Sequence, residues 1–309
     1  MATKKISKKL YYLRAFEYND PLDLEQCLRQ LLAIADNVSK TEIVRAGEVT
    51  QITHRDLAPT KADRSLLLHV EKGNQAESIK TIRHKSMNLT EEGDEISPPQ
   101  DQSFMNRECF IFVFEQHVIF CGHNNMSQQA LAAYLHALSE YCHSLDETCS
   151  VCKPSFRSVP NCDKIQMIQD EGVRSILAEL TAYQATINNP PSLFGRLKGL
   201  FRKDDELSNI QDKADLQVNV EIKLDGNTRA SLEAQKELCE QAQMVINEEN
   251  SDFKIITQKG NTIKPDDVKL SKLVYIPKHN NTNGLSRIAA LSELVSYFNE
   301  LQKDNLTQL

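Results

Sequence analysis

The residues best suited to hold a metal are the eight cysteines, of which Cys149 and Cys152 form a CxxC pair. Thiolates at this spacing can bind one side of a zinc ion, but a structural zinc site needs four donors in tetrahedral reach. Cys142, His143 and Cys162 lie nearby without forming a matching second pair. The pair also follows an expected helix, whereas a thioredoxin-like pair lies between a strand and a helix. We therefore predict reduced loop thiols, no bound metal and no cofactor.

The nearest approach to a nuclease motif is an acid and a lysine two residues apart, Glu221 and Lys223. A strand points both side chains to one face, where restriction-type nucleases use such a pair to hold a metal and a phosphate. That chemistry needs a second acidic ligand upstream, and Asp215 is awkwardly close. The His-Glu-x-x-His, Gly-x-Ser-x-Gly and phosphate-loop motifs do not occur in the sequence. The pattern favours an exposed strand face with a cross-strand ion pair, and we predict no catalytic residues.

Basic residues are concentrated in the second half of the chain. Four of them lie within eight positions, interleaved with leucine and phenylalanine: Arg196, Lys198, Arg202 and Lys203. Such an amphipathic segment suits a membrane surface, a partner's groove or a row of phosphates. It suits equally well a short helix that packs on the protein's own core. Lys223 and Arg229 add positive charge on an expected strand and at the helix start that follows it.

Composition indicates a globular protein, with 40% hydrophobic and 26% charged residues. The formal net charge of −7 argues against a uniformly basic nucleic-acid coat protein but leaves room for a local basic face. No stretch approaches the roughly 20 apolar residues of a membrane-spanning helix, and no apolar run follows the basic N-terminus. We therefore expect a cytoplasmic protein with reduced cysteines.

The elements that must position these residues form an α+β pattern in the first half. A strand is expected at Leu10–Phe16, followed by a helix that Asp20-Pro21 opens. Two buried strands, 109–114 and 117–121, flank Glu115-Gln116 as a tight hairpin without the favoured glycine. Ser127 then caps a helix. Further short strands are expected at 65–71 and 78–84, and a surface loop at 88–103.

The second half repeats this mixture after a polar stretch with two prolines. The sequence predicts a strand at 164–168 and a helix at 172–187. The alternating run Leu216–Leu224 predicts a half-buried strand, and Ser231 a helix cap. The last expected elements are strands at 253–258 and 268–276 and a helix at 285–302 with Leu285, Ile288, Leu291, Val295 and Phe298 on its buried face. We predict two domains, 1–150 and 164–309, joined by a linker at 151–163, each a mostly antiparallel sheet covered by helices.

The order of these segments resembles the RexA-like phage-exclusion proteins and the KwaB-like proteins of the Kiwa antiphage defence system. The matching features cover most of residues 8–280. They are the strand and leucine helix of Leu10–Leu32, the buried run Cys109–Cys121, the segment Leu193–Leu200, the strand Leu216–Leu224 and the turn Lys259-Gly260-Asn261.

The resemblance implies a non-enzymatic homodimer that binds double-stranded DNA with little sequence preference and acts in antiphage defence. It also implies a membrane protein encoded alongside, which would recruit this cytoplasmic chain to the inner membrane. The basic positions to which DNA contact is carried over are Arg196, Lys198, Arg202, Lys203, Lys223 and Arg229. Contacts of this kind make affinity fall steeply with salt and ignore sequence. Because the net charge is −7, the positive charge must be segregated onto one face.

Two alternative functions stay open. One is a metal-dependent nuclease that uses Glu221 and Lys223. The other is a non-catalytic scaffold or regulatory subunit that binds a membrane protein through the segment Leu193–Phe201.

Overall fold

The computed structural model describes residues 5–57, 65–75, 77–81, 93–181, 217–223, 232–247, 252–265, 267–279 and 282–308. The chain forms two compact units, which we call unit 1 (residues 1–158 and 271–309) and unit 2 (residues 159–270). Both combine antiparallel strands with packed helices, so the predicted α+β class is confirmed. Within the described ranges, no helix is both long and apolar enough to span a membrane.

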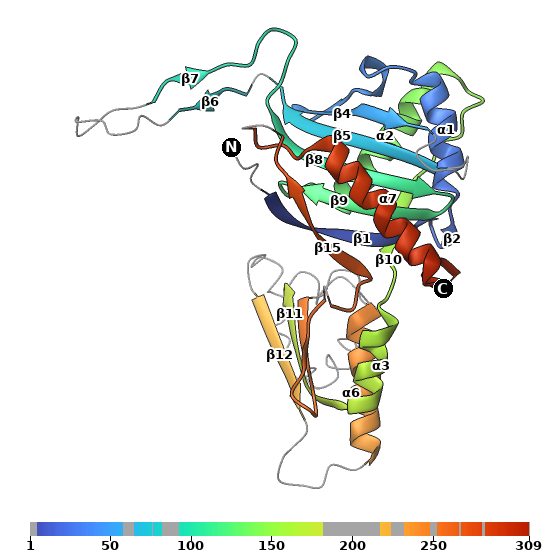
Figure 1. The fold of residues 1–309 in the computed structure, drawn as a ribbon, viewed down its shortest axis with the longest axis vertical. Coiled ribbons are helices and arrows are strands. Elements are labelled where there is room, and N and C mark those ends of the chain that lie inside the picture. The colour runs from blue at the N-terminus through green and yellow to red at the C-terminus, as the bar shows by residue number, and fades with distance from the viewer. Residues whose placement is uncertain are drawn as a thin grey trace, which may run out of the picture. The chain divides into compact units, whose positions relative to one another are not determined.

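Unit 1 is built on a nine-stranded sheet with the order β10-β1-β9-β8-β5-β4-β3, in which β15 and β2 also pair with β1 (Figure 1). Its strands are β1 (Lys5–Glu17), β2 (Asp20–Pro21), β3 (Ile43–Arg45), β4 (Glu48–Asp56), β5 (Ser65–Asn74), β8 (Met105–Phe114), β9 (His117–His123), β10 (Pro154–Ser158) and β15 (Ser271–Pro277). Its helices are α1 (Leu24–Ile34), α2 (Gln128–Leu145) and α7 (Arg287–Lys303), with 3₁₀ turns at Ser39–Thr41 and Leu306–Gln308. A separate two-stranded ribbon pairs β6 (Ile79–Lys80) with β7 (Glu95–Ile96).

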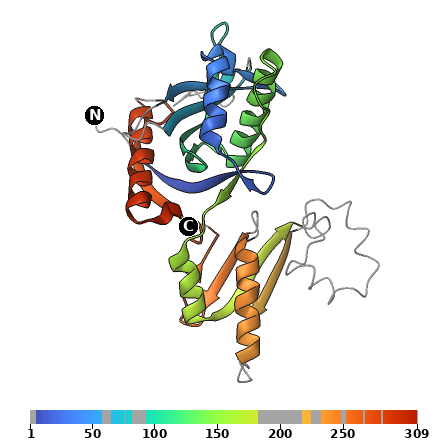
Figure 2. The ribbon, with the colours of Figure 1, turned by 90° about the vertical axis from the view of Figure 1, so that its right-hand side faces the viewer.

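The sheet of unit 1 is covered on both faces. Figure 2 shows α1 (blue) and α2 (green) on one side and α7 (red) on the other. Since side chains alternate along a strand, Leu66, Leu68 and Val70 of β5 join the core under α1 and α2. The opposite face packs on α7, where the rings of Phe112 and Phe298 lie 4.6 Å apart. Buried polar side chains of the strands share this second face with the rings.

The β8–β9 hairpin turns at Glu115-Gln116, as the sequence predicts. Glu115 adopts a φ of +52°, a conformation that glycine usually supplies. A residue outside the hairpin stabilises the turn: the buried Glu25 carboxylate accepts a hydrogen bond from the Glu115 N–H at 3.0 Å. The Glu25 N–H in turn donates to the Glu115 carbonyl at 3.1 Å. A buried acid on α1 therefore stabilises a turn that lacks glycine.

Unit 2 contains a four-stranded antiparallel sheet with the order β12-β11-β13-β14. Its elements are α3 (Cys162–Glu171), β11 (Val173–Thr181), β12 (Gln217–Lys223), α6 (Leu232–Asn247), β13 (Asp252–Thr257) and β14 (Thr262–Ile263). Its core packs both helices against one face of the sheet, with Ile168 from α3, Ala242 and Val245 from α6, and Ile176 and Ile255 from the strands. Gly260 takes a φ of +87° in the predicted turn after β13.

Two predicted elements of unit 2 are wrong. Residues 164–168 lie in helix α3, which starts with the Asn161 side chain accepting from the Asp163 and Lys164 N–H groups. The helix ends at Gly172, whose φ is +69°. The following residues form strand β11 in place of the predicted helix, because β11 pairs with both β12 and β13. Tertiary pairing decides the conformation of this stretch.

The division of the chain also differs from the expected domains 1–150 and 164–309. Residues 271–309 return to unit 1, where β15 pairs with β1 from Lys5↔Pro277 to Tyr11↔Ser271. Helix α7 then covers the adjoining face of the same sheet. A linear division at 151–163 misses this return because strand order in a sheet is not readable from local periodicity.

Candidate functional site

Among the six basic residues assigned to DNA, Lys223 is the one whose position the structure gives. Arg196, Lys198, Arg202, Lys203 and Arg229 lie outside the described residues. Lys223 ends β12, and its side chain is 68% exposed. It alternates with Ile222, which packs against the helix-side core, so Lys223 points to the opposite face of the sheet.

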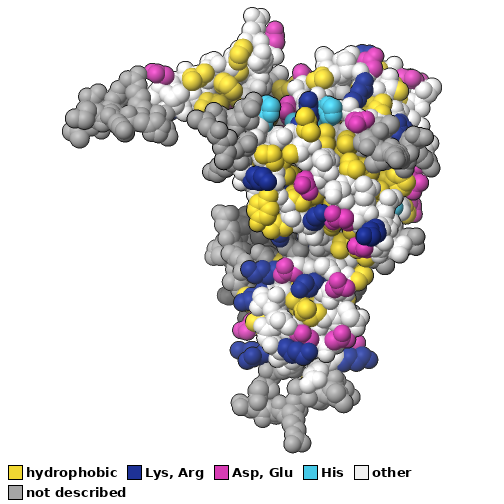
Figure 3. Space-filling view, viewed as in Figure 1, with side chains coloured by type: hydrophobic (Ala, Val, Ile, Leu, Met, Phe, Trp, Pro, Cys, Tyr) yellow, Lys and Arg dark blue, Asp and Glu magenta, His cyan; other side chains and the backbone are white. Residues whose placement is uncertain are grey.

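This opposite face of unit 2, formed by β12, β11 and β13, carries a second exposed lysine. In the strand register, Glu221 faces Leu177, and Leu177 faces Lys254 on its other side. Lys254 lies between the core residues Phe253 and Ile255, which places its side chain on the same face as Lys223. Within the described ranges, Lys254 has no ion-pair partner. On the face of unit 2 that Figure 3 shows, basic side chains are interspersed with acidic ones.

The Glu221–Lys223 pair is an exposed ion pair within one strand, with Lys223 Nζ 3.8 Å from Glu221 Oε2. The register places Leu177 opposite Glu221, so within the described ranges the expected cross-strand ion pair is not formed. In the part of the chain that the structure describes, no other carboxylate or histidine joins Glu221 as a three-ligand set. Asp215 lies outside that part.

The CxxC pair lies in the core of unit 1, not in an open loop. Cys149 and Cys152 are both buried. The imidazoles of His143 and His136 hydrogen-bond through Nδ1 to the carbonyl oxygens of Cys149 and Cys152 respectively. Burial raises the pKa of the Cys149 thiol, which keeps it protonated and a weaker metal ligand. Among the described residues these thiols belong to no group of three metal ligands within coordination reach.

Sequence reasoning missed a row of polar side chains on the α7 face of unit 1. The register pairs Gln51 of β4 with Glu71 of β5, Glu71 with Glu108 of β8, and Glu108 with His123 of β9. His69 lies on the same face two residues before Glu71. This row crosses four adjacent strands, and Glu108 and His123 are both buried. The alternating triplet His69-Val70-Glu71 is the one signal of it in the sequence.

The row contains a close histidine–carboxylate cluster formed by His69, Glu71 and Glu108. The distance from His69 Nε2 is 2.8 Å to Glu108 Oε2 and 3.6 Å to Glu71 Oε1. The other oxygen of Glu108 accepts a hydrogen bond from the Leu285 N–H at 2.7 Å. Glu108 is only 1% exposed, so the cluster fixes the segment before α7 against the sheet.

No protein-family model matches this chain, and no curated protein matches it. The features of the described residues that bear on function are the lysine face of unit 2 and the histidine–carboxylate cluster of unit 1.

Proposed function

We propose that the chain binds the phosphate backbone of double-stranded DNA with little sequence preference, through the face of unit 2 that carries Lys223 and Lys254. The observation that supports this proposal is the exposure of both lysines on the side of the sheet opposite α3 and α6. Lys254 on β13 lies across β11 from Glu221, the strand neighbour of Lys223. At ordinary strand spacing the backbones of Lys254 and Glu221 are therefore about 10 Å apart. Lysines spread over such a face contact phosphates without reading bases.

The ion pair with Glu221 does not remove Lys223 from this role. Both side chains are exposed, and exposed pairs contribute about 0–1 kcal/mol. Exchange of the Glu221 carboxylate for a DNA phosphate therefore costs little free energy. Lys259 is also exposed, at 72%, but its partner Glu171 at 3.9 Å is only 11% exposed, so this argument is limited to Lys223.

The test measures affinity for an arbitrary duplex as a function of salt. Each phosphate contact contributes a slope of about −0.9 to the dependence of log K on log salt. The double variant Lys223→Gln/Lys254→Gln should therefore flatten the slope by about 2 and weaken binding at low salt. A matched control, Lys40→Gln/Lys303→Gln, removes two lysines of unit 1 and should leave both quantities unchanged. Equal slopes for the two double variants, or no binding by the natural sequence at low salt, would refute the proposal.

The biological setting remains the prediction that the resemblance gives: a homodimeric antiphage effector that works with a membrane partner. Co-purification with a membrane protein encoded alongside would support it. Loss of that co-purification in Leu197→Asp, with DNA binding intact, would instead favour the scaffold alternative.

The nuclease alternative has less support. Within the described residues Glu221 has a lysine beside it and lacks the further acidic ligands that a metal-dependent nuclease needs. Magnesium-dependent cleavage of DNA that Glu221→Ala abolishes would reverse this judgement.

A further inference from the structure

We propose that His69, Glu71 and Glu108 form a binding site for a divalent transition-metal ion in unit 1, with an open coordination position toward a neighbouring cavity. One nitrogen and two oxygens can be supplied at once, because the three ligand atoms all lie within 4.8 Å of one another. This proposal is independent of DNA binding, which was assigned to unit 2.

The two distances from His69 Nε2 to the carboxylates fit coordination. Ligands held about 2.1 Å from an ion lie about 3.0 Å apart at right angles and about 3.4 Å apart at tetrahedral angles. The observed distances from His69 Nε2, 2.8 Å to Glu108 and 3.6 Å to Glu71, bracket these values. Small side-chain movements would therefore admit an ion. A nitrogen with two carboxylate oxygens suits zinc, cobalt, manganese or iron, whereas calcium and magnesium prefer oxygen alone.

Neighbouring groups orient the ligands as in known metal sites. His69 Nδ1 lies 3.2 Å from the Thr53 hydroxyl oxygen, and this hydroxyl also donates to the His69 carbonyl at 3.5 Å. When an ion is bound at Nε2, Nδ1 carries the proton and can donate it to the Thr53 hydroxyl. Thr53 is itself the extra residue of a β-bulge, where the β4–β5 register shifts between Ile52 and His54. Bulges commonly redirect one side chain in this way.

Charge gives a second reason for a cation. Glu71 and Glu108 are directly opposite each other in the β5–β8 register, a position where like charges repel. Lys8, a partly buried lysine of β1, interacts electrostatically with Glu108. One partly buried lysine and His69 thus face two carboxylates, one of which is almost fully buried. A dication would compensate both.

A buried imidazole nitrogen beside the cluster is a third observation in favour of a cation. His123, 6% exposed, stands directly opposite Glu108 on β9 and shares its face of the sheet. Its Nε2 hydrogen-bonds to the Asn283 carbonyl at 2.7 Å. Its Nδ1 is buried and has no hydrogen-bond partner among the residues that the structure describes. Because Nε2 donates its proton to this carbonyl, Nδ1 carries a lone pair, which can reach the proposed ion through a bound water.

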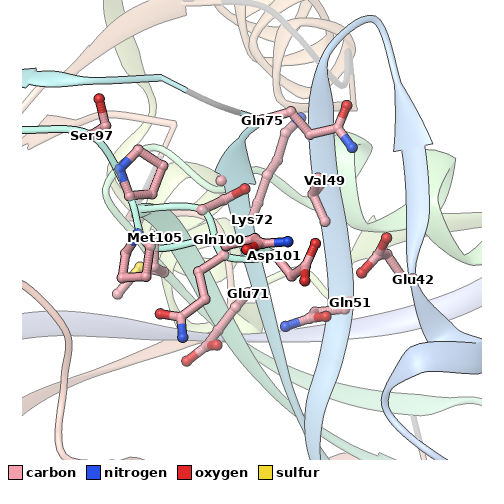
Figure 4. Close-up of a pocket in the computed structure, with 15 residues that line it drawn as sticks. Glu42, Val49, Gln51, Glu71, Lys72, Gln75, Ser97, Gln100, Asp101 and Met105 are labelled. Carbon is pink, nitrogen blue, oxygen red and sulfur yellow. The ribbon is translucent and has the colours of Figure 1, made fainter.

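Glu71 connects the cluster to solvent. It lines a cavity of about 790 Å³ between strands β4 and β5 and the segment Ser97–Ser103 (Figure 4). Gln51, Gln100 and Gln102 are among the other residues around this cavity. Three protein ligands leave at least one coordination position free, as in metal sites that bind a water or a substrate. Of the three ligands, Glu71 is the one that the cavity adjoins, so a solvent or substrate ligand would approach past its carboxylate.

The test is a calorimetric titration of the full chain with Co²⁺ after chelator treatment, with absorption spectra of the same samples. We expect one equivalent to bind without the sulfur-to-cobalt charge-transfer band that the cysteines would produce. Glu71→Gln should weaken binding at least tenfold. Glu48→Gln removes a carboxylate of β4 that pairs with Lys72 and Arg107 outside the cluster, and it should leave the affinity unchanged.

Glu71 is the residue of choice for this substitution because its side chain is 31% exposed, so the variant should fold. Circular dichroism of both variants checks this point. The proposal is overturned if Co²⁺ does not bind, if a thiolate band accompanies the bound equivalent, or if Glu71→Gln and Glu48→Gln bind Co²⁺ equally well.

Discussion

The buried Glu25 carboxylate stabilises the hairpin turn at Glu115, and its contribution can be measured through Glu25→Ala. Glu25 Oε2 accepts from the Glu115 N–H at 3.0 Å, and Oε1 accepts from Arg29 Nε at 2.9 Å. A hydrogen bond to a charged group contributes about 1.5–3 kcal/mol. Arg29 keeps hydrogen bonds to the carbonyls of Leu57 and Ser65, so most of the loss falls on the turn. We expect Glu25→Ala to lower the free energy of unfolding of unit 1 by about 3 kcal/mol.

For a unit of this size, 1 kcal/mol corresponds to about 2–4 °C, so the melting temperature should fall by roughly 6–12 °C. Glu25→Gln keeps one acceptor oxygen and should lose about half as much. The chain has no tryptophan, so unfolding is best followed by circular dichroism. Hydrogen exchange at the Glu115 and Gln116 amides should accelerate in both variants, while exchange in β11 of unit 2 stays constant.

The control is Gln30→Ala, an exposed substitution in the same helix α1 that tests helix propensity alone. The account of the turn fails if Glu25→Ala melts within 2 °C of Gln30→Ala, a difference of about 1 kcal/mol or less. It also fails if the Glu115 amide exchanges at an unchanged rate, because the carboxylate would then not hold the turn.

Two further predictions concern titratable groups of the core. Burial, together with nearby Arg14, lowers the pKa of His117 to about 4. The neutral imidazole therefore stabilises unit 1 above pH 6.5, and as the pH falls toward 4 the free energy of unfolding should drop by roughly 1–2 kcal/mol after allowance for solvent screening. Urea unfolding at several pH values measures this drop, and an identical pH dependence in His117→Gln would contradict the prediction. Burial raises the pKa of Cys121 to about 12 and of Cys142 to about 11, whereas Cys162 is exposed. A thiol reagent should therefore modify Cys162 well before these two cysteines. A Cys162→Ser variant that reacts as fast as the natural sequence would rule this out.

Local signals predicted the elements that local interactions specify. The hairpin at 115–116 follows from two buried runs with two residues between them, and the Ser127 side chain caps α2 by accepting from the Ala130 N–H. The error at 164–168 was avoidable, because Asn161 before this run and Gly172 after it are readable helix boundaries. The strand at 173–181 was not readable, since its conformation depends on pairing with β12 and β13.

The sequence also failed to predict which face of helix α7 is buried. Ile288 was placed on the buried face, yet it is 82% exposed. The buried positions are Ala290, Leu291, Leu294, Tyr297, Phe298 and Leu301. An apolar residue near a helix start fits more than one helical phase, and the packing of Leu294 and Phe298 on the sheet decides between them.

The candidate metal site could not be predicted from the sequence, for a different physical reason. His69 and Glu71 are separated from Glu108 by more than thirty residues, and their contact exists because Glu71 pairs with Glu108 in the β5–β8 register. A shift of this register by one residue would turn the Glu108 side chain to the α1 and α2 face. The register is fixed by apolar residues on that other face, such as Val70 and Cys109, which face each other in the core. Residues that carry no chemistry themselves therefore bring the three ligands together, and substitutions that disturb this packing should impair metal binding as well as stability.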